Sequence, residues 1–403
     1  MFRNDRRVPH VPRPSLLALA AGALLGANAL AQSQLPRQTQ ADDYTRYELL
    51  APGSAKFRIL YEVTATTPGA TQFFNPIRKG SVASDERVND VATGKPLAFS
   101  VVNGLVARAG GVRNADSTGE YIRVMLARPV AAEGESRILI DKTYNDTTSY
   151  KVSGDTIVFS RPLGIKRNSI VMPLGYEIVS SNFPSQIVQE PDGRLKVSFW
   201  NNTPSEAPVQ IRGRRAANLK TTTGLAAELT RRLDERAHQT REIVYYLQQP
   251  ETHAFDLYHD YTETRVGVGT YENVVRTGST VSRPRAIVLD TGEELKFDVQ
   301  QRDSAFVVVF HFTAPRAGES VRLRMFETYT DTARYKLVGD QLVWDRSFGR
   351  PANAVVLPQG WMLTNSSIPA VVGELPDGRI RLDFINPRPD EIAVLITAQR
   401  RTK

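Results

Sequence analysis

The chain contains one segment twice. Residues 144–155 read Tyr-Asn-Asp-Thr-Thr-Ser-Tyr-Lys-Val-Ser-Gly-Asp, and residues 329–340 read Tyr-Thr-Asp-Thr-Ala-Arg-Tyr-Lys-Leu-Val-Gly-Asp. Similarity at this level predicts two copies of one structural unit. The repeat therefore constrains the architecture more than any other feature of the sequence, although it names no substrate and no reaction.

The similarity extends over most of both copies. The aligned pairs include Phe57 with Phe255, Arg78 with Arg276, Gly134 with Gly318, Arg161 with Arg346 and Asn201 with Asn386. We expect the copies at 43–215 and 243–403, with a flexible segment at 32–42 and a linker at 216–242. Each copy has an ordinary length for a single domain, and such domains can bury a core.

Both copies show the composition of β-strands. Residues 57–66 and 255–264 are rich in β-branched and aromatic residues and alternate partly between apolar and polar. Turn signals such as Pro68-Gly69 and Thr93-Gly94 recur about every ten residues. The sequence thus predicts an all-β fold, in which an antiparallel β-sandwich, Ig-like or related, is duplicated in tandem and joined by a helical linker.

One segment has a helical pattern. Residues 225–246 contain strong helix formers, and Leu225, Leu229 and Leu233 recur at every fourth position after a plausible N-cap region. We expect an interdomain helix that lays this leucine stripe against one sandwich. The alternative is a helix that binds a partner or dimerises, although three leucines fall short of a sustained heptad pattern.

The first 31 residues resemble a secretory signal. Basic residues from Arg3 to Arg13 precede an Ala- and Leu-rich run at 16–30, and Ala29-Leu-Ala31 offers a small-x-small cleavage site. We expect export to the periplasm or the exterior after cleavage behind Ala31, by the general or the twin-arginine route. No later run approaches ~18 apolar residues, so the processed chain is not expected to be an integral membrane protein.

Composition excludes several classes of function. The chain has no cysteine, which removes disulfides, thiolate nucleophiles and cysteine metal sites. Loss of the signal, with four arginines and one aspartate, lowers the formal charge from +8 to +5. The remaining basic residues are interspersed with acidic ones rather than clustered, which argues against a nucleic-acid partner.

No catalytic motif is present, and we expect no metal site and no cofactor. The sequence has no Gly-x-Ser-x-Gly elbow, no His-Glu-x-x-His and no phosphate-binding loop. The histidines beyond the signal lie in the linker or second copy, and Tyr61 aligns with His259. His253 and His259 could share a strand face and bind a metal, but their spacing matches no standard pattern. Ordinary strand residues are the favoured interpretation.

The repeated segment supplies the candidate ligand-binding residues. They are Tyr144, Asp146, Tyr150, Lys151, Tyr329, Asp331, Tyr335 and Lys336. Tyrosine rings beside Asp and Lys could form a paired ligand platform, and two copies in one chain would add avidity. The favoured alternative is structural: Asp and Thr bind turn backbone, and tyrosine hydroxyls fix a corner of the fold.

One pattern occurs in both copies, at residues 127–144 and 313–329. It consists of a predicted strand, a Pro…Gly-Glu turn, a second strand and a tyrosine. This hairpin resembles one in the N-terminal β-sandwich domain of M1-type zinc aminopeptidases. The resemblance covers one hairpin in each copy. Because the chain lacks that family's zinc-binding helix, the resemblance implies only the noncatalytic sandwich and assigns no catalytic residue.

Together these features favour an exported, noncatalytic binding or scaffolding protein of the cell envelope. Its ligand would lie between the domains or on loops that correspond in the two copies. One alternative is a hydrolase, or an accessory protein of one, with chemistry confined to the second copy and to His253, His259 or His311. The other is a structural envelope component that contacts protein partners through the helix at 225–246. The identity of a ligand or partner and the oligomeric state remain open.

Overall fold

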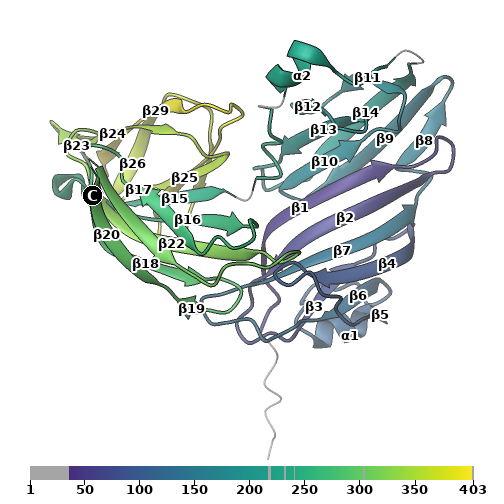
Figure 1. The fold of residues 1–403 in the computed structure, drawn as a ribbon, viewed down its shortest axis with the longest axis horizontal. Helices are drawn as coiled ribbons and strands as arrows, with labels where there is room; N and C mark the ends of the chain where they lie inside the picture. Colours follow the sequence, from purple (N-terminus) through teal and green to yellow (C-terminus); the bar gives the residue numbers. More distant parts are fainter. Residues whose placement is uncertain (1–35, 217–218, 231–232, 240, 303–304, 402–403) are drawn as a thin grey trace, which may run out of the picture. The chain divides into compact units, whose positions relative to one another are not determined.

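The regular structure of the described chain consists of β-strands apart from two short α-helices and one 3-10 turn, which confirms the predicted all-β class (Figure 1). This computed structural model describes residues 36–216, 219–230, 233–239, 241–302 and 305–401. Residues 35–403 form one compact unit. The predicted signal at 1–31 lies outside the described residues. Among those described, no helix is long and apolar enough to cross a membrane.

The first half of the unit, as we call β1 to β14, contains three sheets. Its elements are β1 (Gln40–Leu49), β2 (Lys56–Ala65), β3 (Gln72–Pro76), β4 (Val82–Asp90), β5 (Phe99–Asn103), α1 (Gly104–Ala109), β6 (Glu120–Met125), β7 (Ser136–Asn145), β8 (Tyr150–Ser153), β9 (Thr156–Leu163), β10 (Arg167–Val171), β11 (Tyr176–Ser181), β12 (Gln186–Gln189), β13 (Leu195–Trp200) and β14 (Ala207–Arg215). The large sheet has the order β12-β13-β10-β1-β2-β7-β4, and the smaller sheets have the orders β11-β14-β9-β8 and β3-β6-β5.

The second half, β15 to β29, has a corresponding set of sheets. Its elements are β15 (Glu242–Leu247), η1 (Pro250–Thr252), β16 (Ala254–Glu263), β17 (Thr270–Val274), β18 (Thr280–Val288), β19 (Glu293–Glu294), β20 (Lys296–Arg302), β21 (Ala305–His311), β22 (Val321–Thr330), β23 (Tyr335–Val338), β24 (Gln341–Phe348), β25 (Ala352–Val356), β26 (Trp361–Ser366), β27 (Val371–Glu374), β28 (Ile380–Ile385) and β29 (Ile392–Arg400). Its sheets have the orders β19-β18-β22-β16-β15-β25-β28-β27, β23-β24-β29-β26 and β17-β21-β20.

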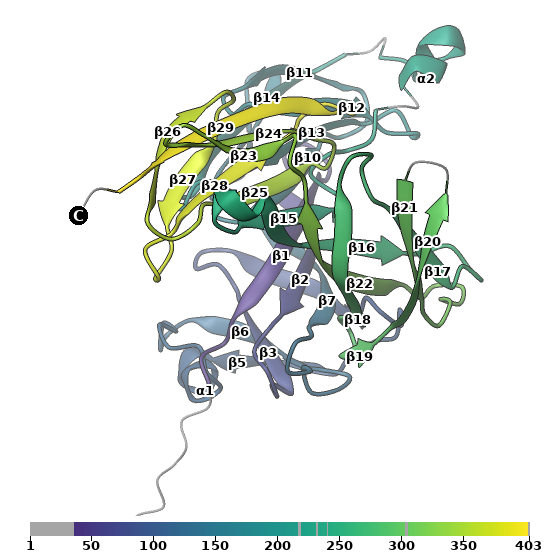
Figure 2. The same cartoon turned by 90° about the vertical axis from the view of Figure 1, so that its left-hand side faces the viewer.

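The strand orders of the two halves match except for the short β19. In both, the first strand forms a parallel pair, β1 with β10 and β15 with β25, and these two pairs correspond when β19 is left out of the count. The small three-stranded sheets also correspond, and Figure 2 shows β3, β5 and β6 beside α1 in the first half and β17, β20 and β21 in the second. The two halves therefore contain sheets with the same connectivity.

Alternation along the central strands builds a core between the large sheet and the smaller ones. In β2, Phe57, Ile59, Tyr61 and Val63 are buried while the residues between them are half-buried. They belong to a cluster that includes residues of all three sheets in the first half. A second cluster fills the second half in the same manner. Apolar burial on this scale is the main favourable term in folding.

The predicted helix at 225–246 is wrong over much of its length. Among the described residues of this segment, only α2 (Gly224–Thr230) is helical; the chain at 233–239 is not helical, and β15 begins at Glu242. Residues of β15 pair with β16 and with β25, so sheet formation overrides helix propensity there. Leu225 and Leu233 are exposed, which contradicts the expected packing of the leucine stripe.

Candidate functional site

The four predicted tyrosines lie in the cores of the two halves. Tyr144, Tyr150, Tyr329 and Tyr335 are at most 6% exposed. The hydroxyl of Tyr150 donates to the backbone oxygen of Leu50 at 3.0 Å, and that of Tyr335 donates to the backbone oxygen of Gln248. These bonds fix the chain where β1 and β15 end, which is the structural role favoured from the sequence.

The two predicted aspartates are buried in corresponding turns. Asp146 accepts hydrogen bonds from the backbone and side chain of Ser149 and from Ser81. It also lies 3.1 Å from the Arg161 guanidinium, as Asp331 lies 2.7 Å from that of Arg346. Burial acts to raise the pKa of Asp146, but the hydrogen bonds from its neighbours outweigh burial and hold that pKa well below the ordinary value.

The two predicted lysines remain at the surface: Lys151 is exposed and Lys336 is half-buried. Of the eight predicted residues, Tyr144 alone lines one of the five cavities reported for the described part of the chain. The structure therefore does not gather the eight side chains around one cavity. A ligand-binding role for them stays a prediction.

A cavity opens at a corresponding position in each half. Its volume is about 490 Å³ in the first half and about 770 Å³ in the second. Six aligned pairs line both cavities: Tyr47 and Tyr245, Arg78 and Arg276, Pro162 and Ser347, Gly164 and Gly349, Ile165 and Arg350, Glu206 and Glu391. The two cavities are thus the same site of the fold with different side chains.

Lys142 lines the first-half cavity from inside the sandwich. It follows the buried Ile138 and Ile140 in the alternation of β7, and only 4% of it is exposed. Its Nζ donates to Asn75 Oδ1 at 2.7 Å and lies 5.0 Å from the centre of the Tyr144 ring. Among the described residues, no carboxylate forms an ion pair with it. Burial, with a smaller effect of Arg161, lowers the pKa of Lys142 to about 7.

The second half has an acid at this position. Glu327 lies opposite Leu257 in the strand register, as Lys142 lies opposite Ile59. Asn273, which corresponds to Asn75, donates its amide to both carboxylate oxygens of Glu327 at 2.8 and 2.7 Å. The charge at the inward position is therefore reversed between the halves, and the asparagine amide serves as acceptor in one half and donor in the other.

An arginine completes the second-half arrangement. His259 Nε2 lies 3.8 Å from Glu327 Oε2, and its Nδ1 lies 2.6 Å from Arg350 Nη2. Arg350 also donates to the backbone oxygen of Asp260 at 2.9 Å. Burial, followed by the charge of Arg350, lowers the pKa of His259. The first half has Tyr61 and Ile165 at the positions of His259 and Arg350, so no such chain of polar groups forms there.

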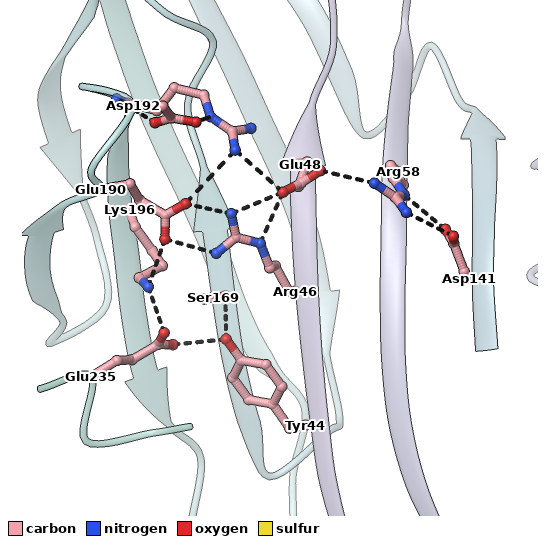
Figure 3. Close-up of polar contacts among 11 residues, drawn as sticks. Tyr44, Arg46, Glu48, Arg58, Asp141, Ser169, Glu190, Asp192, Lys196 and Glu235 are labelled. Atoms are coloured by element: carbon pink, nitrogen blue, oxygen red, sulfur yellow. Dashed lines mark hydrogen bonds and ion pairs between the residues drawn. The ribbon is translucent and has the colours of Figure 1, made fainter. Parts of the chain in front are cut away.

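Part of the linker covers the second-half cavity and is held by both halves. Arg236 lines the cavity and donates to the backbone oxygen of Gly349 at 3.2 Å. Its neighbour Glu235 accepts from Tyr44 at 2.9 Å and pairs with Lys196 at 2.7 Å (Figure 3). Figure 3 shows that this contact continues into an ion-pair network on the outer face of the large first-half sheet; its further members include Arg46, Glu48, Arg58, Asp141 and Glu190.

A third cavity, of about 600 Å³, lies between the halves. It is lined by residues of both halves and of the linker, among them Glu62, His238, Arg241, Thr262 and Arg322. His238 Nε2 lies 3.4 Å from Glu62 Oε1, and this contact raises the pKa of His238. Several polar groups thus line one cavity together with the apolar side chains Val63, Val91 and Ile138.

Buried ion pairs hold the halves together beside this cavity. Arg137 of β7 forms two bonds of 2.8 Å with Asp290, and Arg322 of β22 lies 3.4 Å from Glu135. Arg137 and Arg322 occupy corresponding positions, and each contacts an acidic residue of the other half. All four side chains are at most 7% exposed. Burial outweighs the attraction of Arg322 and raises the pKa of Glu135 to about 7.

The remaining histidines do not form a catalytic or metal-binding group with one another. His253 Nδ1 contacts the backbone oxygen of Tyr335 at 2.8 Å, and His311 Nε2 lies 2.8 Å from Asp298 on an exposed strand. Neither these two nor His259 lines one of the five cavities. Within the described ranges, no group of three or more potential metal ligands is present.

No family model and no curated protein matches the chain. Solved structures similar to it include an aminopeptidase N family protein from Idiomarina loihiensis, at 10% identity and TM-score 0.27, covering 39% of this chain and 29% of that one. An M1 zinc metallopeptidase from Deinococcus radiodurans has 11% identity and TM-score 0.29, covering 49% and 52%. The collagen adhesin from S. aureus has 6% identity and TM-score 0.18, covering 77% and 86%.

The chain therefore bears a faint resemblance to M1 aminopeptidase structures, as its hairpins suggested. It spans from under a third to about half of the length of those chains. Similarity this low assigns neither an activity nor a site residue to the protein. The candidate site has to be judged from the side chains described above.

Proposed function

We propose that the chain is an exported, noncatalytic binding protein of the cell envelope, built from two copies of one β-sandwich unit. The duplication is supported by the sequence repeat together with the matching strand orders of the two halves. Export is proposed from the signal-like residues 1–31, and a noncatalytic role from the absence of catalytic motifs in the sequence.

The observation that carries the binding role is the cavity between the halves. Its volume of about 600 Å³ suits a small molecule, and side chains of both halves and of the linker line it. The buried ion pair of Arg137 with Asp290 joins the two halves beside this cavity. A site whose walls are fixed beforehand loses little conformational entropy on binding. The imidazole of His238, the guanidinium of Arg241 and the carboxylate of Glu62 favour a polar ligand.

Native mass spectrometry of the protein purified from the cell envelope tests this role. We expect a complex heavier than the processed chain, and we expect loss of the added mass in the Arg241→Ala and Glu62→Ala variants. The matched control is Glu177→Ala on β11. It removes an exposed ion pair with Arg214 of β14, and this variant should keep the ligand. Equal retention by all variants, or histidine-dependent turnover of substrate by the purified protein, would refute the proposal.

A further inference from the structure

We propose that the first-half cavity binds a small organic acid, whose carboxylate pairs with the amine of Lys142 and whose apolar body fills the space above it. This site is separate from the cavity between the halves. It does not depend on the binding role proposed there.

The first step concerns the missing counter-ion. Lys142 is 4% exposed and has Asn75 as its hydrogen-bond acceptor. An ammonium group has three donors, so two remain for a ligand. The charged groups that face it are Arg161 of β9 and Glu86 of β4. Arg161 is paired with Asp146, and Glu86 forms no ion pair with Lys142.

The second step is the contrast with the other half. There the chain itself supplies both charges of the corresponding cluster: Glu327 is the acid, Arg350 is the base, and His259 lies between them. In the first half the cation is present, but among the described residues no acid forms an ion pair with it: Glu86 and the exposed Glu206 are near the cavity without pairing with Lys142. A buried charge is stabilised only by a partner or by hydrogen bonds. A carboxylate from outside the chain would provide the missing partner.

The third step is the chemistry of the cavity wall. Apolar and aromatic side chains line most of it, namely Ile59, Leu163, Ile165, Pro76, Pro162, Tyr47 and Tyr61. Polar groups lie among them, including Arg78, Gln40 and the exposed Glu206. With a volume of about 490 Å³, the cavity accommodates a molecule with one acidic group and an apolar chain or ring. Inorganic anions would leave this apolar surface uncovered.

Binding should depend on pH through Lys142. The ligand requires the ammonium form, while its own carboxyl group is ionised above pH ~5. With a pKa of about 7 in the free protein, the ammonium fraction falls about tenfold per pH unit above neutrality. Affinity should therefore be about 100-fold weaker at pH 9 than at pH 6. The other charged groups that face Lys142 are Arg161 and Glu86; an arginine guanidinium does not lose its proton in this range.

Isothermal titration calorimetry of the full chain with benzoate, hexanoate and 4-phenylbutyrate at pH 6 tests the site. Benzamide serves as the uncharged counterpart of benzoate. We expect saturable binding of at least one acid, no binding of benzamide, and loss of affinity by about tenfold or more in Lys142→Met, since a charge-assisted bond disappears. Lys56→Met, which removes an exposed lysine at the start of β2, should bind as the native chain does.

A second measurement does not require a variant. In protein labelled with ¹³C at lysine Cε, saturation with the tightest acid should raise the titration midpoint of Lys142, because the carboxylate favours the ammonium form. The proposal is overturned if none of the three acids binds, if Lys142→Met binds them as tightly as the native chain, or if the midpoint does not move on saturation.

Discussion

Replacing Lys142 with methionine should stabilise the protein at neutral and acidic pH. Methionine is similar in length and flexible enough to fill the same space in the sandwich. The substitution removes a charge that the fold buries without a carboxylate partner. A buried side chain that opposes folding is unusual, and its presence is one reason to look for a ligand there.

The size of the effect follows from the pKa of Lys142. The difference between an ordinary value of 10.5 and about 7 corresponds to about 5 kcal/mol, at ~1.4 kcal/mol per pKa unit. The variant leaves Asn75 Oδ1 without its donor, which costs about 1–3 kcal/mol. A net gain of about 2–4 kcal/mol is therefore expected below pH 7.

The sign of the pH dependence distinguishes this cause from better packing. Between pH 7 and about 10.5 the unfolded lysine binds more protons than the folded one, so the native chain gains stability as pH rises. The advantage of Lys142→Met should be largest at pH 6 and should shrink towards pH 10. Urea denaturation of both proteins at pH 6, 8 and 10 measures this.

Lys56→Met provides the control, because an exposed lysine should contribute little at any of these pH values. The reasoning is refuted if Lys142→Met is less stable than the native chain at pH 6. It is also refuted if the difference between the two proteins does not change between pH 6 and pH 10.

Three further substitutions test the interpretation of other buried groups. Glu135→Gln should stabilise the chain at pH 8 by up to about 3 kcal/mol, because the pKa of Glu135 is about 7 in the folded chain against an ordinary value of 4.5. Since the folded pKa is the higher one, this gain should vanish below pH ~4.5, where Glu135 is protonated in both states. A gain of equal size at pH 4, measured by urea denaturation, would contradict the prediction. Asp290→Ala leaves Arg137 buried without its acid and should destabilise the chain by about 3–5 kcal/mol, whereas an unchanged melting temperature would show that the pair is not buried in solution. Asp146→Ala and Asp331→Ala should each lower the free energy of unfolding by about 2–4 kcal/mol, since each removes several hydrogen bonds from a turn. A binding defect without loss of stability would instead support the ligand platform.

The sequence allowed the all-β class to be predicted, because alternation and turn residues are local signals. Phe57, Ile59 and Tyr61 alternate at the strand period, and their burial follows from that period. The helix was overextended for the opposite reason. Residues 242–246 follow strong helix formers in the chain, but their pairing with β16 and β25 depends on partners distant in the sequence. Local propensity does not contain that information.

The candidate site was only partly visible in the sequence. The tyrosines and aspartates that recur in the repeated segment lie in turns and core in the structure. Lys142 was overlooked, although it interrupts an apolar alternation between Ile140 and Tyr144 and aligns with an acid in the second copy. Lys142 shares its cavity with Ile165 and Tyr61, which are distant from it in the sequence, so its surroundings could not be predicted from the sequence.

The pKa of Lys142 in the free protein is the most direct test of this account. It can be read from the ¹³C titration of labelled lysine Cε, with Lys142→Met used to assign the signal. A midpoint near 7 is the predicted result, because the amine is buried without a carboxylate. A midpoint near 10 would contradict the account, since it would mean that the amine is solvated or already paired.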